Sequence, residues 1–364
     1  MTFDADAPAT DLQPTLSDYL RIARLDHVTK HVFIIPGIVL ALLLRPDEAT
    51  LALSPLLAGF VSAVCLASAN YVINEWLDRE FDRYHPEKSQ RAAVQKDLSP
   101  VVVGVEYAAF LALGLFLAWT VNSTFFVLGL LFLVSGITYN VRPIRSKDLV
   151  FADVLSESLN NPLRLMLGWA MVDPMTLPPA SVLLAYWFGG AFLMNAKRLA
   201  EFRDIVAEQG QELLGRYRRS FRYYTERRLL VASLLYALLS MFFLAVFLIK
   251  YRIEYLIVFP AIALLFTEYF ALALRTNSVA RKPELLFKAG RMMALVVLAC
   301  ALFLFASAYT LFDEGHVRVD ILYAGFGRTK KGFANAFGTV LLGTALLGEG
   351  HTRARWLAVR IAAV

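Results

Sequence analysis

The sequence contains little of what stabilises a secreted or soluble globular domain. It has only 2 cysteines in 364 residues, and both Cys65 and Cys300 lie inside apolar runs. This placement argues against disulfides and predicts that both cysteines act as small hydrophobic residues. The first 17 residues lack both a basic stretch and an apolar stretch, so no cleavable signal sequence is predicted. Residues 1–17 are instead expected to form a disordered tail.

Long apolar runs take up most of the remaining chain. Hydrophobic residues make up 58% of the sequence, mean hydropathy is +0.56, and several runs approach the roughly 20 residues that a helix needs to cross a bilayer. We therefore predict an all-α integral membrane protein with one domain over residues 18–312 and a tail of unassigned structure over 313–364. About nine spans are expected, at residues 31–46, 51–77, 98–121, 123–140, 149–171, 179–197, 229–249, 253–274 and 291–312.

The distribution of basic residues predicts the orientation of these spans. With a cytoplasmic N-terminus, the inner segments hold 25 Lys and Arg residues and the outer loops hold 3. The positive-inside rule then predicts a multi-pass plasma (inner) membrane protein whose N-terminus and large polar loops are cytoplasmic. The stretch from Ser17 to Lys30 is amphipathic and basic enough to lie on the membrane surface. No nucleic-acid partner is predicted, and the sequence leaves open whether the chain is a homo-oligomer.

A polar motif closes the second predicted span. Asn74, Asp78 and Asp82 are spaced four residues apart, so on a helix they share one face. Two carboxylates and an amide suit Mg²⁺, which takes a few carboxylates together with water and substrate phosphates. Basic residues that could hold phosphate oxygens follow directly, namely Arg79, Arg83, Lys88 and Arg91. The competing interpretation is a solvated helix end with a pair between Glu75 and Arg79.

The fifth predicted span carries a second polar group. Arg164 is the only Lys or Arg that lies away from the ends of the nine spans, and an arginine at that depth normally faces a partner or a water-filled cavity. Polar residues at helical spacing precede it on one stripe: Asp153, Glu157, and Asn160 or Asn161. We interpret the stripe as a cavity wall that faces the second span. The alternative is that Glu157 and Arg164 only join helices.

The third polar element follows the sixth span. Lys197 and Glu201 share a helical face, and Arg198 meets Glu201 three residues later. At the mouth of a helix these residues favour a role in substrate binding. The basic stretch from Arg216 to Arg228 is interpreted as membrane anchoring. Arg142 and Lys147, in the loop between the fourth and fifth spans, complete the predicted substrate-binding set.

The second-span motif resembles the UbiA prenyltransferase superfamily, whose first motif reads approximately Asn-Asp-x-x-Asp-x-x-x-Asp. The matching positions are Asn74, Glu75, Asp78 and Asp82, with Glu75 in place of the usual aspartate, and the continuation His-Pro-x-Lys-x-x-Arg begins at His85. The resemblance covers about residues 20–312 and implies a nine-helix intramembrane enzyme. The superfamily's usual second motif is rich in aspartate, but this chain has Lys197-Arg198-Leu-Ala-Glu201-Phe-Arg203 there.

The phrases NYVINEWLDREFDRYHPEKSQRAAV, NNPLRL and KRLAEFR are similar to the decaprenyl-phosphate phosphoribosyltransferase branch of that superfamily. This resemblance implies Mg²⁺-dependent transfer of 5-phosphoribose from phosphoribosyl diphosphate (PRPP) to a polyprenyl phosphate, for synthesis of cell-envelope polysaccharide precursors. It implies that Asn74, Asp78 and Asp82 hold the metal, with Glu75 as an additional candidate. Phosphate oxygens would be held by Lys88, Arg91, Lys197 and Arg198. The ribose and acceptor-phosphate cavity would be lined by Asp153, Glu157, Asn160 and Arg164.

Two alternatives stay open. Ordinary prenyl transfer from a prenyl diphosphate to an aromatic acceptor would use the same fold and first motif, but it predicts an acidic second motif. A transporter or lipid-binding protein without catalysis would account for charges within the membrane. It would not account for metal-ligand spacing beside a set of phosphate-binding cations.

Overall fold

The computed structural model describes residues 13–85, 88–275 and 289–312, together with residues 278, 280 and 286. Every regular element in this part of the chain is a helix, so the all-α prediction is confirmed. Six helical segments are long and apolar enough to cross a membrane: Leu53–Asp82, Pro100–Val121, Ser123–Asn140, Glu226–Tyr251, Ile253–Ala273 and Gly290–Ser307. The chain is therefore a multi-pass membrane protein. The predicted tail over 313–364 lies outside the described residues.

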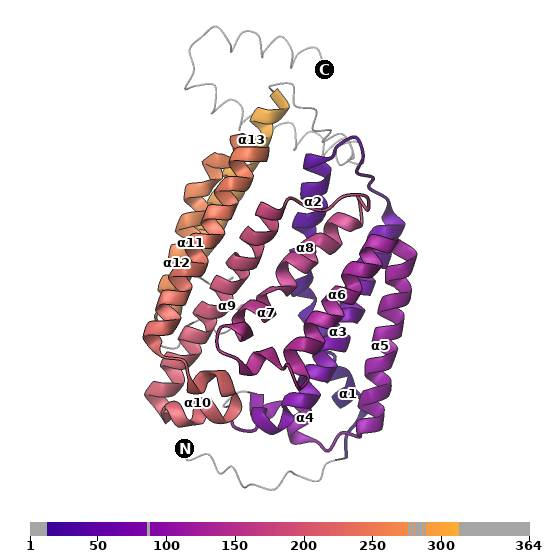
Figure 1. The fold of residues 1–364 in the computed structure, drawn as a ribbon, viewed down its shortest axis with the longest axis vertical. Coiled ribbons are helices and arrows are strands. Elements are labelled where there is room, and N and C mark those ends of the chain that lie inside the picture. Colours follow the sequence, from indigo (N-terminus) through magenta and orange to yellow (C-terminus); the bar gives the residue numbers. More distant parts are fainter. Residues whose placement is uncertain are drawn as a thin grey trace.

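The long helices pack side by side along one direction (Figure 1). In chain order they are α2 (Ile35–Leu44), α3 (Leu53–Asp82), α5 (Pro100–Val121), α6 (Ser123–Asn140), α8 (Asn160–Ala170), α9 (Ala180–Gln209), α11 (Glu226–Tyr251), α12 (Phe259–Ala273) and α13 (Gly290–Phe312). Short helices gather at one end of the bundle, namely α1 (Leu16–Ile22), α4 (Ala92–Gln95) and α10 (Gln211–Tyr217). The carboxyl end of α3 lies at this end, so the polar motif lies next to the short helices.

The predicted span over 149–171 is interrupted. It forms α7 (Ala152–Ser158) and α8, with Leu159 between them. Pro162 has no N–H to donate to the carbonyl of Ser158, which weakens the helix at this point. Leu159 still keeps helical dihedral angles and accepts a hydrogen bond from Leu163. The chain therefore passes from α7 to α8 through a residue that keeps helical geometry.

The segment before the first long helix packs one of its faces against the bundle. Tyr19 and Ile22 of α1 are buried in a cluster that also contains Val72 of α3. The following 3₁₀ helix η1 (Leu25–Ile34) contacts α3 and α8. The segment predicted to lie on the membrane surface over Ser17–Lys30 thus buries part of its apolar face against protein, while Leu20 and Leu25 stay exposed.

Two glycines allow α2 and α8 to cross closely. A β-carbon on Gly37 would lie 1.9 Å from the carbonyl oxygen of Leu165, and one on Gly168 would lie 2.0 Å from that of Ile34. Neither backbone atom can move aside without shifting a helix. Only glycine fits at this crossing, which fixes α8 against the N-terminal part of the chain.

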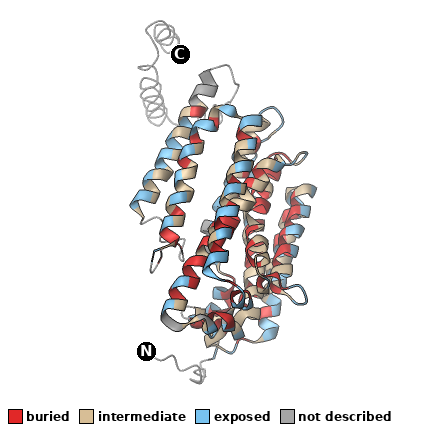
Figure 2. Ribbon diagram, turned by 60° about the vertical axis from the view of Figure 1, so that its left-hand side comes forward, coloured by how far each residue is buried: buried red, intermediate tan, exposed pale blue. Residues whose placement is uncertain are grey.

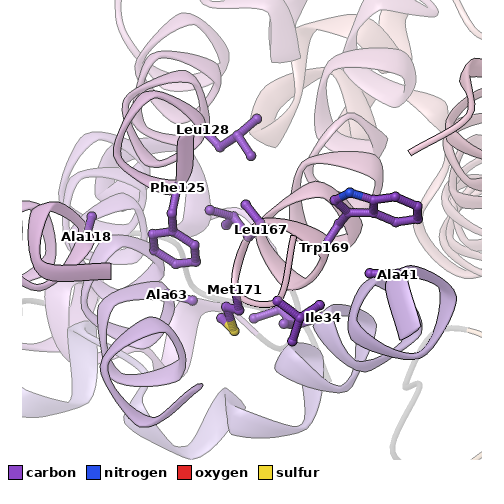
Figure 3. Close-up of a cluster of buried hydrophobic side chains, with 11 residues drawn as sticks. Ile34, Ala41, Ala63, Ala118, Phe125, Leu128, Leu167, Trp169 and Met171 are labelled. Carbon is purple, nitrogen blue, oxygen red and sulfur yellow. The ribbon is translucent and has the colours of Figure 1, made fainter. Parts of the chain in front are cut away.

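An apolar cluster fills the bundle around this crossing. Trp169 and Leu167 of α8 pack with Ile34 and with Phe125 of α6, as the close-up in Figure 3 shows. Burial is concentrated on the inward faces of the helices, and many outward faces are exposed (Figure 2). Exposed side chains on these faces are frequently large and apolar, including Phe116, Trp119 and Phe242. This pattern fits a bundle whose solvent over most of its length is lipid.

Candidate active site

The acidic face of α3 is neutralised by cations from the loop after α6. Asp78 Oδ1 lies 2.6 Å from Lys147 Nζ and 2.9 Å from Arg145 Nη2. The same Lys147 ammonium donates to Asn74 Oδ1 at 3.2 Å and to Asn140 Oδ1 at 2.7 Å. The helix thus presents Asn74 and Asp78 to one cation, as their spacing predicts.

Asp82, one turn further along α3, pairs with the loop that follows it. Arg91 donates to Asp82 Oδ2. Lys88, in the 3₁₀ helix η2 (Lys88–Gln90), interacts electrostatically with both Asp82 and Glu201. Two of the predicted phosphate-binding cations are therefore held beside the acidic face.

His85 connects this loop to α9. Its Nδ1 accepts a hydrogen bond from the backbone N–H of Lys88 at 3.2 Å, so the ring proton belongs on Nε2. His85 Nε2 then donates to Glu201 Oε1, also at 3.2 Å. Burial lowers the pKa of His85, although its hydrogen bond to Glu201 opposes this shift. A neutral ring at pH 7 satisfies both contacts.

Arg198 of α9 joins three carboxylates. Its guanidinium lies 2.9 Å from Glu157 Oε2, 3.1 Å from Glu201 Oε2 and 3.7 Å from Asp153 Oδ2. Only 4% of the Arg198 side chain is exposed, so the guanidinium and the carboxylates neutralise one another in place of water. The structure thus brings together the predicted Asp153, Glu157, Arg198 and Glu201. Lys197, the residue before Arg198 on α9, interacts electrostatically with Glu201 and Glu157.

Arg218 is a site residue that the sequence analysis missed. It follows α10, and its guanidinium lies 3.4 Å from Asp153 Oδ2 and 3.3 Å from Tyr139 Oη. Asp153 also accepts hydrogen bonds from Tyr224 at 2.6 Å and from Ser220 at 3.2 Å. The dense basic stretch around Arg218 gave no periodic signal that could show which arginine turns inward. For Arg218 the anchoring interpretation was wrong.

Three other predicted residues lie apart from the Asp78 centre. Glu75 is buried and pairs with Arg24 at 2.8 Å. Arg142 is exposed. Arg164 lies over the ring of Phe132, with its Cζ 5.1 Å from the ring centre.

The two predicted asparagines differ in their surroundings. Asn160 Oδ1 is buried and accepts no hydrogen bond from the described residues. The Asn161 amide packs on Gly190, where an added β-carbon would lie 2.1 Å from its Nδ2. The absence of a side chain at Gly190 therefore provides the space that the Asn161 amide occupies.

Backbone strain is concentrated at this end of the bundle. Among the described residues, three that are not glycine have positive φ: Arg24 at 50°, Arg145 at 33° and Phe151 at 64°. Both arginines pair with carboxylates of α3. Phe151 donates its backbone N–H to Tyr224, which binds Asp153. Such conformations persist where the surroundings enforce them, which is frequent at functional sites.

The acidic face of α3 fits a divalent cation that is completed by a ligand. No group of three or more His, Cys, Asp or Glu side chains suited to a metal occurs in the part of the chain that the structure describes. A site made of protein carboxylates alone is therefore not present there. Mg²⁺ commonly uses only one or two carboxylates together with substrate phosphates. The ion pairs described above use Asp78 Oδ1 and Asp82 Oδ2, so each carboxylate has a second oxygen.

Two site lysines are tuned by burial, which predicts a pH dependence. Burial lowers the pKa of Lys147 to about 8, against the attraction of Asp78, and burial likewise lowers that of Lys88 to about 8. As pH rises through 8 both ammonium groups lose their proton, and the site loses positive charge.

We expect the affinity of the wild type for pyrophosphate to fall between pH 7 and 9 relative to that of Lys147→Arg, whose guanidinium stays charged. Equilibrium binding of pyrophosphate to the wild type and to Lys147→Arg at each pH checks this prediction. The titration of pyrophosphate itself affects both proteins equally, so it cancels in the comparison. Parallel pH curves would contradict it.

Comparison with known proteins agrees with this architecture. The model of the UbiA prenyltransferase family matches residues 32–290. A UbiA homologue from Archaeoglobus fulgidus bound to DMAPP and Mg²⁺ is 21% identical, with a TM-score of 0.60 over 80% of this chain and 98% of that chain. Digeranylgeranylglyceryl phosphate synthase is 17% identical, with a TM-score of 0.55 over 78% and 96% of the two chains. A UbiA homologue from Aeropyrum pernix K1 is 18% identical, with a TM-score of 0.54 over 77% and 98%. No curated protein sequence matches significantly.

The fold and the site define an intramembrane enzyme of the transferase class, with its polar centre at one end of a helical bundle. The chain belongs to the UbiA prenyltransferase family.

Proposed function

We propose that this protein transfers 5-phosphoribose from PRPP to a polyprenyl phosphate and releases diphosphate. The observation that carries the proposal is the position of Arg198. At the place where the aspartate-rich second motif of prenyl-transferring relatives is expected, this chain buries a guanidinium among three carboxylates. Because Arg198 already neutralises these carboxylates, the place does not suit a second metal ion, which favours a donor whose separate phosphate groups are held by other cations.

The donor would be held by the cations around the acidic face of α3. Asn74, Asp78 and Asp82 would hold Mg²⁺, which neutralises the charge that develops on the departing diphosphate. Lys88, Arg91 and Lys147 lie beside these residues and would bind phosphate oxygens through charge-assisted hydrogen bonds. Lys197 and Arg218 extend the positive surface towards α9 and α10.

The reaction would be a displacement at the anomeric carbon. The bond between that carbon and the diphosphate oxygen breaks, and a bond to an oxygen of the lipid phosphate forms. A phosphate monoester is already ionised at neutral pH, so no general base is required. The role of this chain is to orient the two anions and to stabilise the leaving group with fixed positive charges.

Ordinary prenyl transfer is the second candidate, and family membership supports it. The relatives from A. fulgidus have been solved with DMAPP or GPP and Mg²⁺. A prenyl diphosphate carries one diphosphate group, which the Asp78 centre alone could hold. This candidate leaves Arg198 and Arg218 without a substrate-related role.

We further propose that the enzyme lies in the plasma membrane with this end of the bundle facing the cytoplasm.

The proposal is tested with purified protein in detergent, Mg²⁺, radiolabelled PRPP and a polyprenyl phosphate. Thin-layer chromatography should show label moving into the lipid fraction. Replacing the polyprenyl phosphate with the corresponding polyprenol should abolish this, because the nucleophile is then missing. Turnover of a prenyl diphosphate with an aromatic acid, without any labelled lipid, would assign the protein to ordinary prenyl transfer.

A further inference from the structure

A second polar cluster lies deeper in the bundle than Asp78. Tyr71 precedes Asp78 by seven residues, which places it on the same face of α3 and about 10 Å further from the polar end. Arg164 of α8 makes a side-chain hydrogen bond with Tyr71. Arg164 also interacts electrostatically with Tyr186 of α9 and with His31 of η1. Four elements therefore converge on this point.

Two buried polar atoms in the cluster have no hydrogen-bond partner among the described residues. They are Nδ1 of His31 and Nε of Arg164. Only 6% of His31 and 7% of Arg164 is exposed. Buried polar groups in native proteins are nearly always paired, and an orphaned one calls for a specific explanation such as an absent ligand.

The groups in this cluster favour an anion. Arg164 forms no ion pair with a carboxylate in the described part of the chain, in contrast to Arg198. Lys30 lies with its Nζ 5.2 Å from the centre of the Tyr71 ring. It is exposed, and it interacts electrostatically with His31 and with Lys197. Lys30 is thus positioned between the deep cluster and the basic residues of α9.

An apolar cavity adjoins the cluster and indicates what the anion is attached to. The cavity has a volume of about 220 Å³, and Tyr186 belongs to both its wall and the polar cluster. Leu165, next to Arg164, also lines it, together with Leu40, Val182 and Phe247. An anionic group at Arg164 would therefore have an apolar space directly beside it.

We infer that Lys30, His31, Tyr71, Arg164 and Tyr186 form a subsite for the phosphate monoester of a polyprenyl phosphate, whose chain begins in the adjoining cavity. This inference rests on the proposed function, because it assigns the acceptor its own place about 10 Å along α3 from the metal-binding face. Arg164 and Lys30 supply charge, and the Tyr71 hydroxyl and the His31 ring supply hydrogen bonds. The 5-phosphate of the sugar donor is also a phosphate monoester, but it has no apolar chain to occupy the cavity.

Direct binding tests the subsite without requiring turnover. Equilibrium binding of radiolabelled farnesyl phosphate to the full-length protein in detergent is compared among the wild type, Arg164→Gln and Lys30→Gln. Each variant is expected to bind at least about tenfold more weakly, as the loss of a charge-assisted contact predicts. Lys30 is exposed, so Lys30→Gln remains informative if Arg164→Gln fails to fold. The matched control is Lys250→Gln, which removes an exposed cation near the carboxyl end of α11 and should bind farnesyl phosphate normally.

Each remaining outcome decides a separate point. Unchanged affinity in both variants, or equal affinity for farnesol and farnesyl phosphate, would overturn the subsite. Binding of ribose 5-phosphate that depends on Arg164, without binding of farnesyl phosphate, would overturn the lipid assignment and indicate the sugar donor. Farnesyl phosphate binding that depends on Arg164, in a protein without phosphoribosyl transfer, would leave the subsite standing and refute the proposed function alone.

Discussion

Asp78→Asn is expected to lower turnover by on the order of 10²–10³-fold, the loss seen when one stabilising group is removed from a transition state. The amide keeps the shape of the carboxylate but loses the charge that a divalent cation needs. It also leaves the charges of Lys147 and Arg145 without their shared partner, 2.6 and 2.9 Å away. The measurement is the initial rate of the purified variant across a range of Mg²⁺ concentrations.

The metal titration separates two roles of Asp78. If Asp78 holds the metal, the variant should need a higher Mg²⁺ concentration for half-maximal rate. If it only anchors the loop after α6, the rate should fall without a change in Mg²⁺ dependence. Glu80→Gln removes an exposed carboxylate from the same turn of α3 and should behave as the wild type. Turnover of Asp78→Asn above half of the wild-type value would refute the assignment.

Arg198→Met is expected to destabilise the fold by about 3–5 kcal/mol, the cost of removing one partner from a buried ion pair. The substitution leaves Asp153, Glu157 and Glu201 without the guanidinium that lies within 3.7 Å of all three. Methionine fills much of the same volume, so the loss reports on charge more than on packing. Apparent melting temperature and the monodisperse fraction in detergent measure the effect.

Two further variants of α9 sharpen the comparison. Arg203→Met removes an arginine five residues later, whose side chain is 41% exposed and pairs with the exposed Glu226. It should change stability little, because exposed ion pairs contribute little. Arg198→Lys should fold but lose activity, since an ammonium cannot present the planar set of donors that joins three carboxylates. An Arg198→Met protein as stable as the wild type would show that the three acids are neutralised in another way.

Periodic features of this molecule could be predicted from its sequence. Apolar runs located the long helices because a bilayer imposes a minimum length. The spacing of Asn74 and Asp78 predicted a shared face, and both residues bind the same ammonium group. The spacing of Glu157 predicted a polar, inward-facing stripe, but the stripe was expected to face the second span, whereas Glu157 pairs with Arg198 of α9.

Features set by loops could not be predicted in this way. Of the basic residues after α6, Arg142 is exposed whereas Arg145 turns in to Asp78. The difference depends on the positive φ of Arg145, which no spacing rule anticipates. Arg218 likewise lies outside a long helix, directly after α10, where no helical period distinguishes it from the neighbouring arginines. The burial of α1 depends on packing between distant segments, which a local amphipathic pattern does not reveal.

The pairing of Asp78 has a consequence for the biosynthesis of the protein. Arg145, one of its two cationic partners, lies 67 positions later in the chain, and the contact between His85 and Glu201 spans 116 positions. Chains are synthesised and begin to fold from the N-terminus. Asp78 therefore leaves the ribosome long before the residues that neutralise it. A nascent chain truncated within α6 would carry Asp78 without Arg145 or Lys147, so the end of α3 would have to stay in water until the next loop had been translated.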